Sequence, residues 1–389
     1  MDYQNLSGNW NYPTSIVAGA GTIGQLAACA SMLGMKAPLL ITDPGLAALP
    51  MVDEALTQCL RAKLDATVFS KIKSNPTGQN VLDGVEAYQD GKHDGVIAFG
   101  GGSVIDATKV IALMAGQTFS LWEFDNIDDS VEAFNASLIP PIIAVPTTAG
   151  TGSEVGRAAL ITDEVRQVKK IFFHPHLLPS KVILDPELTI GLPASITAAT
   201  GMDALSHNLE ALCSNTYHPM SEGIAMEGIR LVSVYLTEAV ANGGNVEARM
   251  QMIVASSMGA TAFQKGLGAM HALAHPLGAL YDAHHGLLNA ILMPYVLQAN
   301  RTVITDRIER LARYINIPQP GFDTFLQWVL DLRTTVGIPH SLSEIGIDDK
   351  AQKLVGQMAV VDPTAGTNAI TFSAEQYSQI FMHAVSGRL

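Results

Sequence analysis

The first half of the chain alternates short apolar, β-rich runs with stretches in which apolar residues recur at helical spacing. Six of the short runs are predicted strands, at Ser15–Ala18, Ala37–Thr42, Ala66–Phe69, Gly95–Phe99, Ile142–Val145 and Lys181–Leu184. Helical patterns lie between them, for example at Asn80–Asp90 and Val104–Met114. Because such alternation is typical of βαβ units, it predicts a mostly parallel sheet with helices on both faces.

The pattern changes after Asp185 and Pro186. β-rich runs largely stop, and long helical stretches follow at Ile196–Cys213, Ser221–Asn242, Val246–Gln264, Arg301–Ile315 and Thr324–Val336. The length of 389 residues also exceeds what one core usually holds. We therefore predict an α/β nucleotide-binding domain at residues 1–187 and an all-α domain at residues 188–389.

Composition and charge narrow the classes of function. Hydrophobic residues make up 48% of the chain and charged residues 15%, which supports large buried cores rather than disorder. The net charge of -13 makes nucleic acid an unsuitable partner, because such a surface repels phosphates. Cys29, Cys59 and Cys213 form no CxxC pair, so the sequence predicts neither a disulfide framework nor a thiolate metal site.

The stretch from Tyr3 to Met35 carries no charge, but it does not resemble a leader or a membrane helix. Residues 1–13 lack the Lys and Arg that a signal peptide needs, and glycines interrupt the apolar run that follows. We interpret this stretch as a buried strand, a glycine turn and a packed helix. The expectation is a cytoplasmic protein with no membrane partner.

Two glycine motifs compete for the role of phosphate-binding turn. Gly19–Gly24 matches GxGxxG, and Asp43 follows Gly24 by 19 residues, as in a dinucleotide-binding fingerprint. Gly100–Ser103 follows a stronger strand and opens a helix, where backbone amides and the helix dipole suit a pyrophosphate. We favour Gly100–Ser103, although a plain strand-to-helix turn explains either motif and Ser103 is also a typical N-cap.

Two further features point to a dinucleotide. Asp43 ends a predicted strand, where a carboxylate accepts hydrogen bonds from a ribose and repels a 2′-phosphate, which favours NAD over NADP. The alternative is a cap or turn at Asp43–Gly45. The loop Pro146–Glu154 carries hydroxyls after a parallel strand, where they can meet a ligand, although an ordinary polar loop has the same composition.

Spacing of histidine and aspartate gives the strongest chemical signal. Asp203 and His207 stand four positions apart, which places them about 40° apart on one face of a helix. His271 and His275 form a second pair with this spacing. One carboxylate combined with imidazoles suits Fe, Zn or Ni, whereas Ca and Mg prefer oxygen ligands.

His285 belongs with this group only if the chain bends. It follows His271 by 14 residues, and a straight helix would separate the two by about 21 Å. His284, its neighbour, is a competing candidate that spacing cannot exclude. Three residues interrupt the intervening helix pattern and allow a bend, namely Pro276, Gly278 and Gly286.

Five motifs in order resemble those of the iron-containing, or group III, alcohol dehydrogenases. They are GGGSVIDATK (100–109), PTTAGTGSE (146–154), LDPELT (184–189), GMDALSHNLEA (201–211) and HALAHPLGALYDAHHG (271–286). The resemblance spans nearly the whole chain. It implies a dehydroquinate-synthase-like architecture, an active site in the cleft between an α/β and a helical domain, and a homodimer.

The resemblance also implies roles for individual residues. By motif position, the metal ligands are Asp203, His207, His271 and His285, and His275 is a non-ligand histidine near the substrate. The implied cofactor contacts are Asp43 on the ribose, Gly101 and Gly102 on the pyrophosphate, and Asn75, Ser103, Asp106, Thr147, Thr148, Leu188 and Lys170, with Lys169 as the alternative to Lys170. The sequence departs from the family at His284, where relatives often carry proline.

These observations predict reversible hydride transfer between NAD and a small primary or secondary alcohol, or a diol, with Fe(II) or Zn as the metal. A divalent ion lowers the pKa of an alcohol, and His275, with a reference pKa of about 6.5, is suited to relay the proton. The alternatives are a glycerol-dehydrogenase-like polyol oxidoreductase, a dehydroquinate-synthase-like lyase, and a non-enzymatic metal- and nucleotide-binding protein. The lyase needs several cations around a phosphorylated substrate, whereas Gly201–Gly286 contains Lys265 as its only lysine.

Overall fold

The computed structural model describes residue 12 and residues 14–124, 134–166 and 168–389. The chain divides into two compact units, one of residues 14–148 and 152–190 and one that contains Ala149–Thr151 and Gly191–Leu389. Residues 1–11 and 13, which include the start of the uncharged stretch from Tyr3, lie outside the described part.

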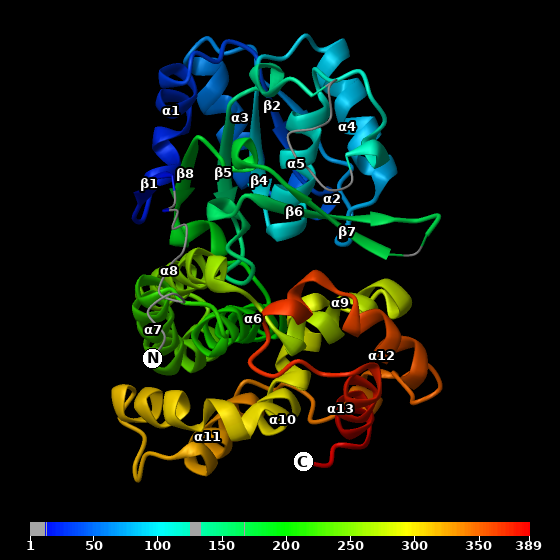
Figure 1. The fold of residues 1–389 in the computed structure, drawn as a ribbon. Helices are drawn as coiled ribbons and strands as arrows, with labels where there is room; N and C mark the ends of the chain where they lie inside the picture. The colour runs from blue at the N-terminus through cyan, green and yellow to red at the C-terminus, as the bar shows by residue number, and fades with distance from the viewer. Residues whose placement is uncertain (1–11, 13, 125–133, 167) are drawn as a thin grey trace. The chain divides into compact units, whose positions relative to one another are not determined.

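Six parallel strands form the main sheet of the first unit, in the order β1-β8-β5-β4-β2-β3 (Figure 1). They are β1 (Ser15–Ala18), β2 (Pro38–Ile41), β3 (Thr67–Phe69), β4 (Gly95–Gly100), β5 (Ile142–Pro146) and β8 (Lys181–Leu184). Each lies where the hydrophobic pattern predicts a strand. The inner strands β4 and β5 are buried along their whole length, as expected of a sheet that is covered on both faces.

Alternate residues of one strand reach opposite faces of this sheet. Leu39 and Ile41 of β2 pack into the core shared with α4 (Gly78–Asp90) and α5 (Gly102–Met114). Leu40 packs into the core shared with α1 (Leu26–Met32) and α3 (Pro50–Arg61). The predicted α/β arrangement with helices on both faces is therefore confirmed.

One antiparallel hairpin was not predicted. β6 (Ala158–Asp163) pairs with β7 (Val168–Phe173) and forms a separate two-stranded sheet in the first unit (Figure 1). The burial of β6 alternates residue by residue, which is the mark of a half-exposed strand. Lys169 and Lys170 interrupt the apolar pattern of β7, and this hid the strand from an analysis of hydrophobic runs.

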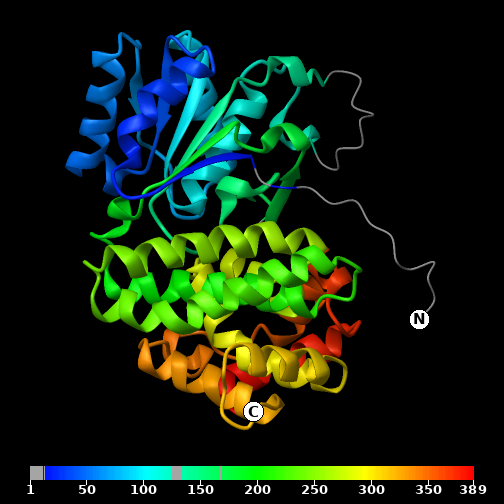
Figure 2. The same ribbon diagram turned by 90° about the vertical axis from the view of Figure 1, so that its left-hand side faces the viewer.

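The second unit is helical throughout its described length after Gly191. Its α-helices are α6 (Ala194–Cys213), α7 (Pro219–Ala241), α8 (Val246–Ala262), α9 (Ala269–Tyr281), α10 (His285–Tyr314), α11 (Phe322–Thr335), α12 (Gln352–Val360) and α13 (Ala374–Ser386). α6 packs against α7, α8 and α10 and is buried from Thr197 to Cys213, so it forms the centre of this unit (Figure 2). The all-α prediction is confirmed.

The helix α10 is longer than predicted. The sequence pattern indicated helix only from Arg301, whereas α10 begins at His285 and continues for 30 residues with Pro294 in its interior. Apolar residues on several sides of its first half hide the helical periodicity, because that half is almost entirely buried. Within the described part of the chain, every helix is too short or too polar to cross a membrane.

Candidate metal centre

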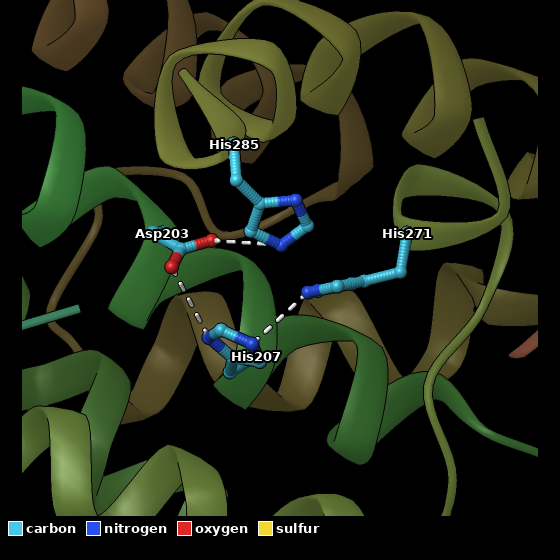
Figure 3. Close-up of side chains that lie close together, drawn as sticks. All are labelled: Asp203, His207, His271 and His285. Atoms are coloured by element: carbon cyan, nitrogen blue, oxygen red, sulfur yellow. Dashed lines mark hydrogen bonds and ion pairs between the residues drawn. The ribbon is translucent and has the colours of Figure 1, made fainter. Parts of the chain in front are cut away.

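Three helices bring four candidate metal ligands together. Asp203 and His207 lie one turn apart on α6 and face His271 of α9 and His285 of α10 (Figure 3). One ligand atom from each residue lies within 4.8 Å of all the others. The Nε2 atoms of His207 and His271 are 3.0 Å apart, and Nε2 of His285 lies 3.9 Å from Oδ1 of Asp203. Ligands about 2.1 Å from a tetrahedral ion are about 3.4 Å apart, so the cluster fits one divalent ion.

The environment of His207 also suits a metal. Burial lowers the pKa of His207 to about 4, which keeps the ring neutral near pH 7. Neutral imidazole is the form that coordinates metals, and two ring nitrogens that face each other across 3.0 Å can share one ion. His285 differs in being partly exposed, with 24% of its side chain accessible, which leaves one side of the cluster open.

A sharp turn between α9 and α10 brings His285 back to His271. α9 ends at Tyr281, Asp282 adopts a left-handed conformation with φ of 50°, and α10 begins at His285. The predicted bend between His271 and His285 is therefore confirmed. The prediction that helix-breaking residues produce the bend was wrong, because Pro276 lies inside α9.

His284 and Gly286, the neighbours of His285, have structural roles. Nδ1 of His284 accepts the N–H of Leu287 and caps α10, so this ring is used in the turn and does not join the cluster. A Cβ atom on Gly286 would lie 2.7 Å from the carbonyl oxygen of Ala199. Glycine at this position thus permits the close approach of α10 to α6, rather than the bend.

Two buried side chains that the sequence did not single out contact the ligands. Oε2 of Glu210 lies 2.7 Å from Nδ1 of His271. Burial lowers the pKa of His271, but the hydrogen bond with Glu210 and the charges of Glu210, Asp203 and Asp362 together outweigh burial and raise the pKa. A raised pKa makes the ring a more basic ligand. Nδ2 of Asn289 lies 2.9 Å from Oδ1 of Asp203 and 3.1 Å from Nε2 of His285. Asn289 follows His285 by one helical turn, so spacing alone could have suggested it.

His275 lies beside this cluster without belonging to it. Its ring stacks on that of His285, with centroids 5.5 Å apart and planes inclined by 12°. Its Nδ1 atom lies 2.8 Å from Oδ2 of Asp362. Burial raises the pKa of Asp362, but the hydrogen bond and the electrostatic attraction of His275, with the hydrogen bonds from Thr364, together outweigh burial and leave the pKa below its usual value. Asp362 is therefore an ionised partner for the ring, from a segment that the sequence analysis had not connected with His275.

The candidate cofactor residues gather at the carboxyl edge of the parallel sheet. Asp43 follows β2, Asn75 follows β3, Gly101 follows β4, and Thr147 follows β5. In open α/β sheets, ligands bind outside this edge. Leu188 follows β8 but packs mainly into the apolar core of this unit.

The two glycine motifs have different surroundings. The carboxylate of Asp185 accepts the N–H groups of Gly21, at 3.2 Å, and of Ile23, at 2.9 Å. The amides of the GxGxxG turn thus already face an anion, which would repel a phosphate. No described side chain caps the N-terminus of α5 at Gly101. This difference favours Gly100–Ser103 as the phosphate-binding turn.

Close packing surrounds Gly101. A Cβ atom at this position would lie 3.2 Å from Oγ1 of Thr148, and the N–H of Thr147 donates to the carbonyl oxygen of Gly100. Ser103 is not an N-cap, since its hydroxyl donates to the carbonyl oxygen of Ser74. Gly101 and Gly102 are only partly buried, so a ligand can reach the backbone amides at the start of α5. A side chain on Gly101 would hinder that ligand.

Two further candidates, Asp43 and Asp106, have partners within the first unit. Oδ1 of Asp43 accepts the N–H groups of Gly45 and Leu46 and caps α2 (Pro44–Ala47), so the cap interpretation is confirmed. The buried carboxylate of Asp106 accepts hydrogen bonds from the Ser153 hydroxyl and the Leu160 N–H. Each of its two oxygens therefore has a partner within the protein.

Of the two lysine candidates, Lys169 reaches Asn75. Nζ of Lys169 lies 2.9 Å from Oδ1 of Asn75, and the two lysines point to opposite sides of β7 because they are consecutive in a strand. The side chain of Lys169 therefore lies with the other cofactor candidates at this edge of the sheet. The side chain of Lys170 points to the opposite side of β7.

Comparisons with known proteins agree with this arrangement. The family model described as "Iron-containing alcohol dehydrogenase" matches residues 13–186, and the model for the C-terminal part of that family matches residues 197–385. The chain is similar to 4-hydroxybutyrate dehydrogenase of Cupriavidus necator, with 38% identity over 95% of this chain and 97% of the relative. It is similar to NAD-dependent methanol dehydrogenase of Bacillus methanolicus, with 32% identity over 97% of this chain and 100% of the relative. The crystal structure of a 1,3-propanediol oxidoreductase superposes with a TM-score of 0.91 at 34% identity, covering 97% of this chain and 100% of that one.

Proposed function

Since this chain belongs to the iron-containing alcohol dehydrogenase family and is a metal-dependent oxidoreductase that uses NAD, we propose that it interconverts small alcohols and their carbonyl compounds through the residues described above. The observation that carries this proposal is the convergence of Asp203, His207, His271 and His285 on one point. It supports a catalytic ion rather than a purely structural one, because His285 leaves one side accessible.

We assign the four clustered side chains as the ligands of Fe(II) or Zn. A divalent ion held there supplies Lewis acidity that lowers the pKa of an alcohol hydroxyl. Three neutral imidazoles and the single carboxylate of Asp203 compensate only half of the ion's charge, so they leave it an effective Lewis acid. Asn289 donates to Oδ1 of Asp203 and thereby holds the carboxylate in place.

His275 is the proposed catalytic residue for proton transfer. Its Nδ1 atom donates to the ionised Asp362, which leaves the lone pair of the neutral ring on Nε2. A base with this orientation can accept the proton of the alcohol and pass it on. Asp362 stabilises the charged ring while the proton resides there, because its carboxylate lies 2.8 Å from Nδ1.

The first unit is the proposed cofactor-binding part and the helical unit the metal-binding part. NAD, which accepts the hydride, would contact the amides at Gly101 and Gly102 with its pyrophosphate and Asp43 with its adenosine ribose. The second carboxylate oxygen of Asp43 remains for the ribose, since Oδ1 caps α2. Asn75, Ser103, Thr147, Thr148 and Lys169 would line the rest of this site.

The names of the relatives guide the proposed substrate class. The relatives named above act on methanol, 4-hydroxybutyrate and 1,3-propanediol, which all carry a terminal hydroxyl. We therefore propose a short primary alcohol or diol as substrate, with polyols as the second candidate. Homodimerisation, which the resemblance implies, and a cytoplasmic location, which the N-terminal sequence suggests, are further predictions that light scattering and cell fractionation can test.

Spectrophotometry tests this proposal. Protein reconstituted with Fe(II) or Zn is incubated with a panel of short alcohols and diols and either NAD or NADP, and NADH formation is followed by absorbance. We expect steady turnover with NAD and at least one primary alcohol, and loss of turnover in Asp203→Asn. Reconstituted protein that turns over no alcohol or aldehyde of the panel would refute the proposal.

A further inference from the structure

Glu210 connects the metal centre to the start of α9. It lies on α6, three positions after His207 and seven after Asp203, so all three residues share one face of the helix. Its side chain is buried to 96% and makes three contacts that all involve N–H groups. Oε2 lies 2.7 Å from Nδ1 of His271 and 2.7 Å from the backbone nitrogen of Gly268, and Oε1 lies 2.6 Å from that of Met270.

Both carboxyl oxygens of Glu210 act as hydrogen-bond acceptors, because Oε2 accepts the N–H of Gly268 and Oε1 accepts the N–H of Met270. An uncompensated buried carboxylate is costly, but two of its partners are backbone amides of the first turn of α9, where the helix dipole favours a negative charge.

The acceptor role of Glu210 determines which nitrogen of His271 carries the hydrogen. A carboxylate only accepts hydrogen bonds, so Nδ1 must be the protonated nitrogen. The lone pair of the neutral ring then lies on Nε2, the atom that faces Nε2 of His207 across 3.0 Å. With the other tautomer, a hydrogen on Nε2 would occupy the direction in which a metal binds.

We propose that Glu210 is a positioning residue for the metal, which locks His271 in the Nδ1–H tautomer and fixes its ring against the other ligands. This inference rests on the metal centre of the proposed function. Neither the motif spacing nor the predicted ligand set assigns Glu210 a role. A simpler alternative is that Glu210 only caps α9, and the two interpretations predict different effects on metal binding.

The chain offers a matched control for helix capping. Oδ1 of Asn368 accepts the N–H of Ala269 at 3.1 Å, so it caps the same turn of α9 without contacting His271. Because Asn368 also exchanges hydrogen bonds with Asn300, Asn368→Ala should lower stability by more than a lost cap, with little effect on metal affinity. Glu210→Gln keeps the shape of the side chain, but its amide can donate to Nδ1 and so admits the wrong tautomer of His271.

The test measures Co²⁺ affinity of the full-length, metal-stripped protein by competition with a chromophoric chelator. We expect the Kd of Glu210→Gln to rise about 10- to 100-fold over wild type, as for other residues that orient a metal-bound histidine. The visible spectrum of bound Co²⁺ should change as well, because it reports ligand number and geometry. Asn368→Ala should stay within about twofold of wild type in Kd, with an unaltered spectrum.

Four outcomes would overturn the inference. An unchanged Kd in folded Glu210→Gln, or an equal loss of Co²⁺ affinity in Asn368→Ala, would show that Glu210 only caps α9. Neither result would contradict the metal centre. A wild-type protein that binds no Co²⁺ would refute the metal centre itself, and the role of Glu210 with it. If circular dichroism shows that Glu210→Gln is unfolded, Glu210→Asp replaces it, since this variant keeps the charge but withdraws it from Nδ1. An unchanged Kd in Glu210→Asp would again contradict the role of Glu210.

Discussion

Nδ1 of His275 lies 2.8 Å from Oδ2 of Asp362, a contact that joins α9 to the segment directly after α12. Asp362 is itself held by the backbone N–H and the hydroxyl of Thr364. The pair is buried, and both partners have their orientation fixed by hydrogen bonds. A carboxylate anchored in this way fixes which nitrogen of His275 is free for proton transfer.

We expect Asp362→Asn to lower kcat at least tenfold while metal content stays at the wild-type value. An amide can donate to Nδ1, so His275 would present a protonated Nε2 and lose its function as a base, a contribution typically of about 100-fold or more. Initial rates and metal analysis of the same preparation measure the effect. Asp323→Asn, which alters an exposed carboxylate paired with Arg301, serves as the control and should leave kcat unchanged. Loss of metal in Asp362→Asn would instead connect Asp362 with ligand placement.

Removal of the metal should destabilise the helical unit. The candidate ligands come from α6, α9 and α10, so an ion that binds only the folded state connects three helices. At a free metal concentration 100 times Kd, binding stabilises the fold by about 2.7 kcal/mol. We therefore expect a lower Tm after chelation and its recovery on addition of Fe(II) or Zn, followed by circular dichroism. Asp203→Asn should show a much smaller response, and an equal response in this variant would argue against the assigned site.

Much of this architecture could be predicted because short stretches of the sequence, through their hydrophobic runs and helical spacing, indicate it. The strands β4 and β5 are short apolar runs, and Asp203 and His207 are one helical turn apart. Asn289 and Glu210 were missed, although both stand at helical spacing from a ligand, because amides and carboxylates at such spacing are common on helices. Asp362 could not have been found, since its contact with His275 arises from the packing of segments far apart in sequence.

The choice between the two glycine motifs can be tested directly. Gly101→Val would place side-chain atoms against Thr148 and over the first amides of α5, so we expect the KM for NAD to rise at least tenfold. The comparison is Gly24→Ala, in the GxGxxG turn, where an added Cβ meets no atom within 4 Å. This variant should keep the wild-type KM. A reversed result would assign the cofactor phosphates to Gly19–Gly24.

Asp43 should decide the preference for NAD. Asp43→Ser removes the charge that repels a 2′-phosphate, while serine remains able to cap α2. We expect the ratio of kcat/KM for NAD over NADP to fall at least tenfold, without a loss of Tm greater than a few degrees. An unchanged ratio would show that Asp43 serves only as a helix cap.

The proposed activity depends on one metal ion that side chains from three helices bind jointly. Anomalous diffraction from crystals of protein reconstituted with Fe(II) or Zn, recorded on both sides of the metal's absorption edge, locates that ion without reference to activity. We predict a single strong peak about 2.0–2.3 Å from the ligand atoms of Asp203, His207, His271 and His285. Catalytically active, metal-loaded crystals with the peak elsewhere, or with these four side chains facing away from it, would contradict the account.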